Sequence, residues 1–594
     1  MSATSRRPGG GGLDPATIVL WTVLAVLVAA GAPLVAAAHL GNRLSQTPQV
    51  LPGNPFQLLF GLADQTVAWP AAATAVLVIL LGALLLLAAL ITVAAVRLRR
   101  RRSRVDRAAR HMGRGRDLHV LGRRGAAASA ARLGVSGPIG LPIAAALASG
   151  QTLYSSWEDC CVDIWGPRTG KTTSRAVPAI LAAPGAVLAT SNKRDLVDAT
   201  RDPRAAAGQV WVFDPQGIVD EPCLWWWDPL SYVVDEVKAS ILADLFSAAA
   251  REPGARTDAY FDSAAQDLLA GLLLAAALDR RPITQVYLWL TDPTDDEPAV
   301  LLRSHGYPLS AAAVAGVVHA PEKQRGGVYG TAQQIAAFLT NRQAVRWVTP
   351  SPPGEDRRQF DPALFVRDGG TLYSLSKEGR GSAGPLVTAL TVAVTEAAEE
   401  LAKRSPGGRL PVPLVAVLDE AANVCRWREL PNLYSHYGSR GICILTILQS
   451  WSQGVEVWGR DGMRKLWSAA NIKVYGGGVS EVEFLGELSQ LVGDFDLRAT
   501  STSHGKGGRS TSHSTRRERV LDVADLAGLP KGRVVVLASG APATLARTLP
   551  WMTGPHAAAV TASIRAHDPA GAATLDGAAQ TAGAGQPRSV VTGR

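Results

Sequence analysis

The sequence predicts an α/β fold with a mostly parallel central sheet, an inserted all-helical domain and two transmembrane helices near the N-terminus. Three observations predict it. Two long runs near the start carry no charged residue, eight later runs are short and apolar, and one long stretch shows only helical periodicity. A chain of 594 residues is long enough to form several separately stable domains.

The two uncharged runs span residues 17–38 and 71–96, and each exceeds the roughly 20 residues that cross a bilayer as a helix. A cleaved signal peptide is the alternative for the first run, since Arg6 and Arg7 precede it. A signal peptide has a shorter apolar core and is not normally followed by a second span. We therefore expect both runs to be transmembrane helices.

Charge predicts how these helices are oriented. Residues 97–124 hold twelve arginines, whereas the loop 39–70 holds one. The positive-inside rule therefore predicts a multi-pass protein of the inner or plasma membrane, with residues 1–16 and the C-terminus in the cytoplasm and the loop 39–70 outside. Residues 97–150 are expected to form a basic juxtamembrane linker. Because these arginines account for much of the net charge of +10, charge supports nucleic-acid binding only weakly.

Eight short apolar runs, each followed by a turn and a helical pattern, predict the strands of a parallel sheet that helices cover on both faces. They are residues 160–165, 185–191, 209–215, 371–376, 413–420, 442–450, 471–477 and 532–539. The sheet domain is expected to comprise residues 151–233 and 349–555, with an all-α insertion at 234–348. Residues 498–518 are expected to form a mobile loop, and the Ala/Gly-rich residues 556–594 a disordered tail.

The stretch DIWGPRTGKTTS at residues 163–174 contains the Gly-Lys-Thr of a phosphate-binding loop. In such a loop, backbone N–H groups between a strand and a helix converge on phosphates, a lysine adds charge and a hydroxyl binds Mg²⁺. Trp165 stands where the motif G-x-x-x-x-G-K-[ST] has its first glycine, but Gly166 can supply the tight turn one residue later. The sequence therefore predicts an ATP site with Thr172 as a Mg²⁺ ligand. Its expected nucleotide-binding residues are Gly166, Pro167, Arg168, Thr169, Gly170, Lys171, Thr172 and Thr173.

A second strand should end in an acid for Mg²⁺ and a carboxylate that polarises the attacking water. The run 413–420 ends in Asp419 and Glu420, which we assign as the Mg²⁺ ligand and the general base. An Asp-Glu pair can also cap a helix, but that interpretation leaves the apolar strand before it unexplained. A third strand ends at Gln449, a candidate for sensing the γ-phosphate or orienting the water. Together these elements predict a P-loop, RecA-like NTPase that hydrolyses ATP.

With these elements in order, the chain resembles the conjugative coupling ATPases of type IV secretion, the TraG/TraD group of the FtsK/HerA superfamily. The matching stretches are GPRTGKTTSRAVPAIL, ATSNKRDLVDATRD, GQVWVFDPQG, WWWDPL, FDPALF with GGTLYSLS, VAVLDEAANV and YGSRGICILTILQSWSQ. The resemblance implies a membrane-anchored ring, usually a homo-hexamer, that moves single-stranded DNA with an attached relaxase into the secretion channel. Its implied partners are the relaxosome, recognised by residues 234–348, and the channel proteins.

The resemblance also implies an arginine finger that completes the site of a neighbouring subunit. The family often places it at the position that is Gly438 here, so the nearest arginine, Arg440, is the expected finger. The alternative is a surface arginine in a turn.

Three functions are compatible with these features of the sequence. The first is a DNA-transfer ATPase. The second is an ATPase that exports proteins alone, or that pumps double-stranded DNA as FtsK does. The third is a membrane scaffold that has lost hydrolysis through Trp165 and the displaced arginine.

Overall fold

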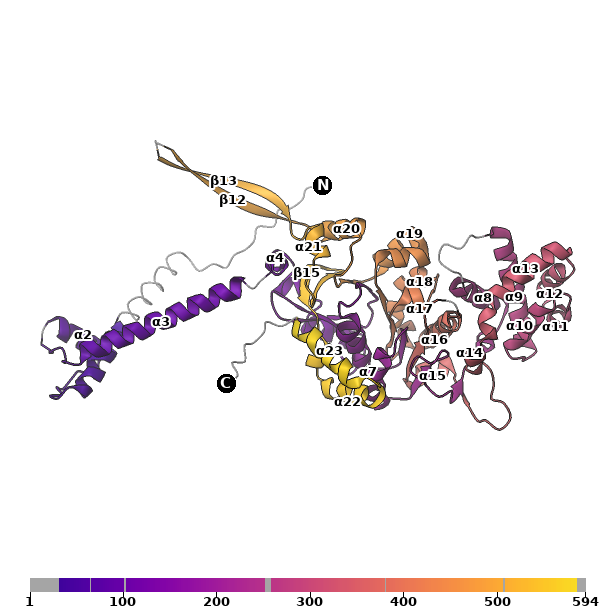
Figure 1. Ribbon diagram of the computed structural model, residues 1–594, viewed down its shortest axis with the longest axis horizontal. Coiled ribbons are helices and arrows are strands. Elements are labelled where there is room, and N and C mark those ends of the chain that lie inside the picture. Colours follow the sequence, from indigo (N-terminus) through magenta and orange to yellow (C-terminus); the bar gives the residue numbers. More distant parts are fainter. Residues whose placement is uncertain are drawn as a thin grey trace. The chain divides into compact units, whose positions relative to one another are not determined.

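The computed structural model describes residues 31–64, 66–100, 103–250, 258–379, 381–505 and 508–584. The chain divides into two compact units, Met1–Ser103 and Arg104–Arg594. Figure 1 shows the helices and strands of both units.

The first unit contains helices joined by irregular segments in its described residues. Residues 31–44 form a helix, and α2 (Pro55–Ala63) and α3 (Ala73–Arg100) follow. Within α3, the window Ala73–Leu90 has a mean hydropathy of 2.8 and is only 6% buried, so it is long and apolar enough to cross a membrane. It coincides with the second predicted span. Residues 17–30, which make up most of the first predicted span, lie outside the described residues.

An 11-stranded sheet forms the centre of the second unit, in the order β2-β1-β15-β14-β11-β3-β10-β9-β4-β8-β5. Its strands from β11 to β5 pair in parallel, and the other four extend the sheet in antiparallel fashion at one edge. The strands are β1 (Leu141–Ala146), β2 (Thr152–Ser155), β3 (Cys161–Ile164), β4 (Val187–Ser191), β5 (Val210–Phe213), β8 (Thr371–Leu375), β9 (Leu414–Leu418), β10 (Ile442–Leu448), β11 (Ile472–Tyr475), β14 (Arg533–Ala538) and β15 (Ala541–Arg547). All eight predicted strands are present, but β14 was expected in the parallel part of the sheet and instead pairs antiparallel with β11 and β15. The predicted α/β fold class is confirmed.

Helices surround this sheet, and a short pair of strands, β6 (Trp225–Trp226) and β7 (Arg358–Gln359), lies outside it. The helices are α4 (Arg104–Ala108), α5 (Arg123–Arg132), α6 (Val177–Ala182), α7 (Asp195–Ala205), α8 (Glu236–Ala250), α9 (Ala259–Leu278), α10 (Thr284–Thr291), α11 (Glu297–Ser304), α12 (Pro308–Val318), α13 (Glu322–Ile335), α14 (Arg342–Arg346), α15 (Pro362–Asp368), α16 (Gly384–Arg404), α17 (Ala421–Val424), α18 (Leu430–Tyr437), α19 (Trp451–Ala469), α20 (Val482–Val492), α21 (Val523–Ala527), α22 (Ala557–His567) and α23 (Gly571–Ala584).

The sheet is buried on both faces. In β9, Leu414, Ala416 and Leu418 belong to one hydrophobic cluster, whereas Val415 and Val417 belong to another. Because successive strand residues point to opposite faces, the two clusters are the two sides of the sheet. The apolar residues of α6 and α7 pack in the second cluster, and those of α16 and α18 pack in the first.

The helical insertion runs from α8 to α14, and Figure 1 shows these helices grouped at one end of the second unit. Its longest helix, α9, also satisfies the length and composition of a membrane span, with a mean hydropathy of 1.4. However, half of α9 is buried, and it contacts α8, α11, α12 and α13. We therefore interpret α9 as the core helix of the insertion.

The sequence did not predict every element. β1 lies within residues 97–150, which were expected to form a linker, and β2 and β15 were not predicted either. The sequences of β1 and β15, LPIAAA and APATLAR, are dominated by alanine and proline, and each has only one of the β-branched or aromatic residues that mark strands. Residues 498–518 do not form the expected loop: the described residues there belong to the two-stranded ribbon β12 (Asp494–Gly505) and β13 (Gly508–Arg519).

The expectation of a disordered tail over residues 556–594 is also corrected. In the described part of this stretch, α22 and α23 form, and α22 packs against α7. Val560 and Ile564 are buried, and their spacing of four residues places them on one face of α22. Two large apolar residues at this spacing are enough to attach an alanine-rich helix to a core that already exists.

Candidate nucleotide site

The candidate site lies where three neighbouring parallel strands end. β3 precedes the phosphate loop, β10 lies next to it, and β9 follows in the sheet. Ile164 is paired with Leu448, and Leu418 with Thr446, so the three strands reach the same edge. Side chains that follow parallel strands meet at that edge, which is where open α/β sheets bind ligands.

The phosphate loop turns sharply into a helix. Arg168 and Gly170 have φ angles of 60° and 91°, in the left-handed region. For a residue other than glycine this conformation stores strain, which is typical of ligand-binding loops. The helix begins with a π-helical turn at Thr172–Ala176 and continues as α6. π-helical turns occur frequently at functional sites, and the free N–H groups at the start of a helix favour anions.

Trp165 belongs to the core beneath the loop. Its side chain is 2% exposed, and its ring packs so closely on Gly476 that a Cβ there would lie 2.2 Å from the ring. Its backbone N–H donates to the Leu448 carbonyl at 2.9 Å, and the Gly166 N–H donates to the Gly477 carbonyl at 2.9 Å. The tryptophan therefore anchors the start of the loop to the two strands beside β3.

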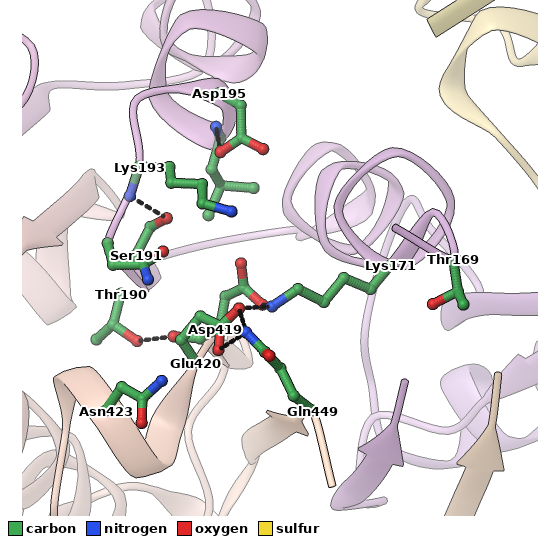
Figure 2. Close-up of polar contacts among 12 residues, drawn as sticks. Thr169, Lys171, Thr190, Ser191, Lys193, Asp195, Asp419, Glu420, Asn423 and Gln449 are labelled. Atoms are coloured by element: carbon green, nitrogen blue, oxygen red, sulfur yellow. Dashed lines mark hydrogen bonds and ion pairs between the residues drawn. The ribbon is translucent and has the colours of Figure 1, made fainter. Parts of the chain in front are cut away.

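Lys171 lies opposite the acidic pair, as Figure 2 shows. Its Nζ donates to Asp419 Oδ1 at 2.9 Å and also to Glu420 Oε1. Gln449 Nε2 donates to both carboxylate oxygens of Glu420, at 2.6 and 2.7 Å. Both acids are almost fully buried, and Glu420 adopts a left-handed φ of 54°. The structure thus brings together predicted site residues from three strands.

Burial and charge act against each other in this cluster. Burial raises the pKa of Asp419 to about 6, although Lys171 acts to lower it. Burial acts to lower the pKa of Lys171, but the attraction of Asp419 and Glu420 outweighs it and leaves that pKa raised. One lysine therefore faces two acids, and the site would accept a further cation.

The residues present fit Mg²⁺ bound together with a nucleotide. Mg²⁺ prefers oxygen ligands, and it usually takes one or two from the protein and the rest from water and phosphate. The Asp419 carboxylate and the Thr172 hydroxyl are ligands of this kind. In the part of the chain that the structure describes, no group of three or more His, Cys, Asp or Glu could hold a metal ion alone. A Mg²⁺ ion at this site would therefore share its ligands with the phosphates.

Arg440 does not belong to this cluster. It ends the turn Gly438–Arg440 that precedes β10, so it lies at the opposite end of β10 from Gln449. Its Nη1 pairs with Glu399 of α16. Any contact between Arg440 and a nucleotide would therefore be made in another subunit.

Residues on the far side of β9 also border the site, although the sequence did not predict a role for them. The Thr190 hydroxyl, at the end of β4, donates to the Asp419 carbonyl at 3.2 Å. Lys193 follows in the turn that leads into α7, Asp195 is the first residue of α7, and Figure 2 shows both beside the cluster. The sequence did contain an indication of this part of the site, because β4 was predicted as a strand and a polar run follows it. Only the pairing of β4 with β9, which the sequence does not reveal, places that run at the site.

Comparisons with known proteins agree with this geometry. A family model described as the TraM recognition site of TraD and TraG matches residues 413–531, a range that includes Asp419, Glu420, Arg440 and Gln449. No curated protein matches the sequence.

Several solved structures are similar to this chain. The unbound monoclinic form of the bacterial conjugative coupling protein TrwBdeltaN70 is 17% identical, with a TM-score of 0.50, and the match covers 68% of this chain and 87% of that chain. Its trigonal form in complex with sulphate is 17% identical, with a TM-score of 0.50 and coverage of 66% and 86%. The plasmid coupling protein TrwB in complex with ADP and Mg²⁺ is 16% identical, with a TM-score of 0.48 and coverage of 66% and 85%.

The predicted resemblance to conjugative coupling proteins is therefore confirmed. Residues 413–531 match the domain described for TraD and TraG, and the chain shares the fold of a solved bacterial conjugative coupling protein. The sequence similarity to TraD and TraG is thus found over residues 413–531, and the likeness to the solved coupling protein is one of fold.

Proposed function

We propose that the protein is a membrane-anchored ATPase that couples ATP hydrolysis to the transfer of DNA, with an attached relaxase or other protein, into a type IV secretion channel. The observation that carries the proposal is the meeting of Lys171, Asp419, Glu420 and Gln449 at the ends of three parallel strands. α3 would anchor the chain in the inner or plasma membrane as part of a two-span anchor, with both termini in the cytoplasm.

Different residues of the chain would carry out different parts of ATP hydrolysis. Lys171 would leave the acids and bind the phosphates together with the N–H groups of residues 166–173, while Thr172 and Asp419 hold Mg²⁺. The bound Mg²⁺ supplies positive charge that stabilises the phosphoryl group during transfer. Once Lys171 has moved, Glu420 is free to accept a proton from the attacking water. Gln449, which donates twice to Glu420, would keep that carboxylate directed at the water.

Assembly would complete the site. We propose a homo-hexameric ring in which Arg440 of one subunit reaches the nucleotide of the next. Charge and stacking inside such a ring would hold single-stranded DNA without reading its sequence. The helical insertion α8 to α14 would receive the relaxosome, and channel proteins would bind the assembled ring.

The decisive measurement is ATP turnover by the full-length protein in lipid nanodiscs, with and without single-stranded DNA. Lys171→Ala should lower turnover at least about 100-fold, because it removes the cation that stabilises the transferring phosphoryl group. Lys323→Ala is a suitable control, since Lys323 is exposed on α13. Unchanged turnover in Lys171→Ala would defeat the site assignment.

The same experiment separates the other functions. Stimulation by single-stranded DNA supports DNA transfer, and stimulation by double-stranded DNA alone would indicate a pump of the FtsK kind. Turnover that responds to neither DNA would indicate protein export. A wild-type protein that binds ATP but never hydrolyses it would be a scaffold.

A further inference from the structure

The turn between β4 and α7 borders the nucleotide site from the side opposite the phosphate loop. β3 carries the loop, and β4 is the neighbour of β9 on the other side of the acidic pair. The turn contains Lys193, and Asp195 is the first residue of α7; both belong to the stretch ATSNKRDLVDATRD. The proposed function gives these two residues no task.

Hydrogen bonds fix this turn against the acidic pair. The Thr190 hydroxyl donates to the Asp419 carbonyl at 3.2 Å, and the Lys193 N–H donates to Ser191 Oγ at 3.1 Å. Asn192 Nδ2 donates to Glu378 Oε1 at 2.6 Å, and Asn423 Nδ2, in α17 just after Glu420, donates to the same oxygen at 2.8 Å. The backbone that carries Lys193 is therefore held in place relative to the strand that carries Asp419.

Lys193 is a positively charged side chain beside the site that is available to bind a ligand. It is exposed, and it makes no ion pair among the residues that the structure describes. Two neighbouring cations are engaged, since Lys171 pairs with Asp419 and Glu420, and Arg194 pairs with Asp198. Figure 2 shows the Lys193 side chain directed toward the space between Asp195 and Lys171.

Asp195 connects the two sides of the site electrostatically. Burial raises its pKa, while the Leu196 N–H, Lys193 and Lys171 act to lower it. Asp195 in turn helps to raise the pKa of Asp419. This carboxyl group is therefore within electrostatic reach of both lysines, so the turn after β4 faces the same space as the phosphate loop.

We propose that Lys193 is a second phosphate-binding cation, which contacts the terminal phosphate of a nucleoside triphosphate from the β4 side, and that Asp195 is a positioning residue for it. A phosphate chain held by the loop after β3 would extend its terminal phosphate toward β9 and β4, which lie on the same side of β3 in the sheet. That phosphate carries the charge that a triphosphate has and a diphosphate lacks, so Lys193 distinguishes the two nucleotides. This inference rests on the proposed function of the site.

The test compares the affinities of ADP and a non-hydrolysable ATP analogue for the full-length protein in nanodiscs, measured by calorimetry. Lys193→Ala should weaken binding of the analogue about 10- to 100-fold, the effect of one charge-assisted hydrogen bond, and leave ADP binding within about twofold. Lys193→Arg should restore most of the loss. The matched control is Lys377→Ala, because Lys377 follows the adjacent strand β8 but donates to the Gln216 carbonyl at 3.0 Å instead.

A positioning role for Asp195 predicts a distinct pattern of nucleotide affinities. Asp195→Asn should weaken analogue binding less than Lys193→Ala does, and the double variant should be no weaker than Lys193→Ala alone, because both changes remove the same contact. Asp195→Glu should retain part of the affinity. Additive losses would overturn this role.

The remaining outcomes are distinct. Equal losses for ADP and the analogue, or affinities that match Lys377→Ala, would overturn the inference for Lys193. Normal binding of both nucleotides with lost stimulation by DNA would assign Lys193 to DNA and overturn it as well. A wild-type protein that binds neither nucleotide would instead overturn the proposed function itself.

Discussion

Lys171 is the residue on which the charges of the site depend. It is the cation of two almost fully buried acids, and removing one partner from a buried ion pair costs about 3–5 kcal/mol because the other charge is left without compensation. A phosphate that enters the loop therefore competes with Asp419 and Glu420 for the same ammonium group. Mg²⁺ can take the place of the lysine beside Asp419, so nucleotide and metal are expected to bind together.

The pKa of Asp419 predicts how this binding depends on pH. Because burial raises that pKa to about 6, the carboxylate that binds Mg²⁺ is lost as the pH falls through 6. The affinity for Mg²⁺ with nucleotide should fall roughly tenfold per pH unit below that value. Asp419→Asn should bind Mg²⁺ weakly at every pH, without this dependence.

Stability without nucleotide should change in the opposite direction. A carboxyl group whose pKa is higher in the folded state stabilises the fold below its unfolded value of 3.8, and this stabilisation is lost as the pH rises through about 6. The unfolding temperature of the wild type should therefore fall more than that of Asp419→Asn between pH 4 and pH 6. Parallel curves for the two proteins would contradict the raised pKa.

At the scale of elements, the sequence predicted what short-range patterns determine. The parallel strands were found because they are apolar on both faces, and the residues after β3, β9 and β10 could be assigned because parallel strands end at a common edge. The edge strands β1 and β15 could not be found from sequences rich in alanine and proline. The partner of Trp165 could not be found either, since Gly476 follows a strand far away along the chain and only the order of strands brings them together.

The contact between Trp165 and Gly476 predicts an effect on stability. In Gly476→Ala the new Cβ would lie 2.2 Å from the indole ring, and overpacking of this kind typically costs about 1–3 kcal/mol. The variant should unfold at a lower temperature and bind ATP more weakly, because the ring anchors the phosphate loop. Gly486→Ala in α20 is the matched control: nothing lies within 4 Å of its Cβ, and alanine favours a helix. If both variants are as stable as the wild type, the ring does not anchor the loop.

At the scale of the whole molecule, the position of Arg440 implies cooperation between subunits. β10 has seven residues, and at about 3.3 Å per residue Arg440 lies on the order of 20 Å from Gln449 of the same chain. It is thus too far away to contact a nucleotide in its own site. The proposed finger role requires a neighbouring subunit and the release of Arg440 from Glu399.

The position of Arg440 predicts that hydrolysis requires neighbouring subunits. Arg440→Ala should lower ATP turnover about 10³-fold or more, the usual contribution of an arginine finger, while nucleotide binding stays intact. Glu399→Gln disrupts the same ion pair but keeps the arginine, so it should retain turnover. If both variants lose turnover equally, the Arg440–Glu399 ion pair has a structural role and Arg440 is not a finger.

Mixing two inactive variants provides the stricter measurement. Arg440→Ala keeps its own Lys171 but supplies no arginine, whereas Lys171→Ala supplies the arginine but cannot use it. When the two proteins assemble into one ring, some interfaces join an intact Lys171 to an intact Arg440, so turnover should return as the proportions approach equality. The turnover recovered at a given ratio should also rise with total protein concentration, because assembly precedes hydrolysis. If no mixture recovers activity although both variants bind to each other, Arg440 does not act between subunits, and the arginine that completes the site has to be sought elsewhere in the chain.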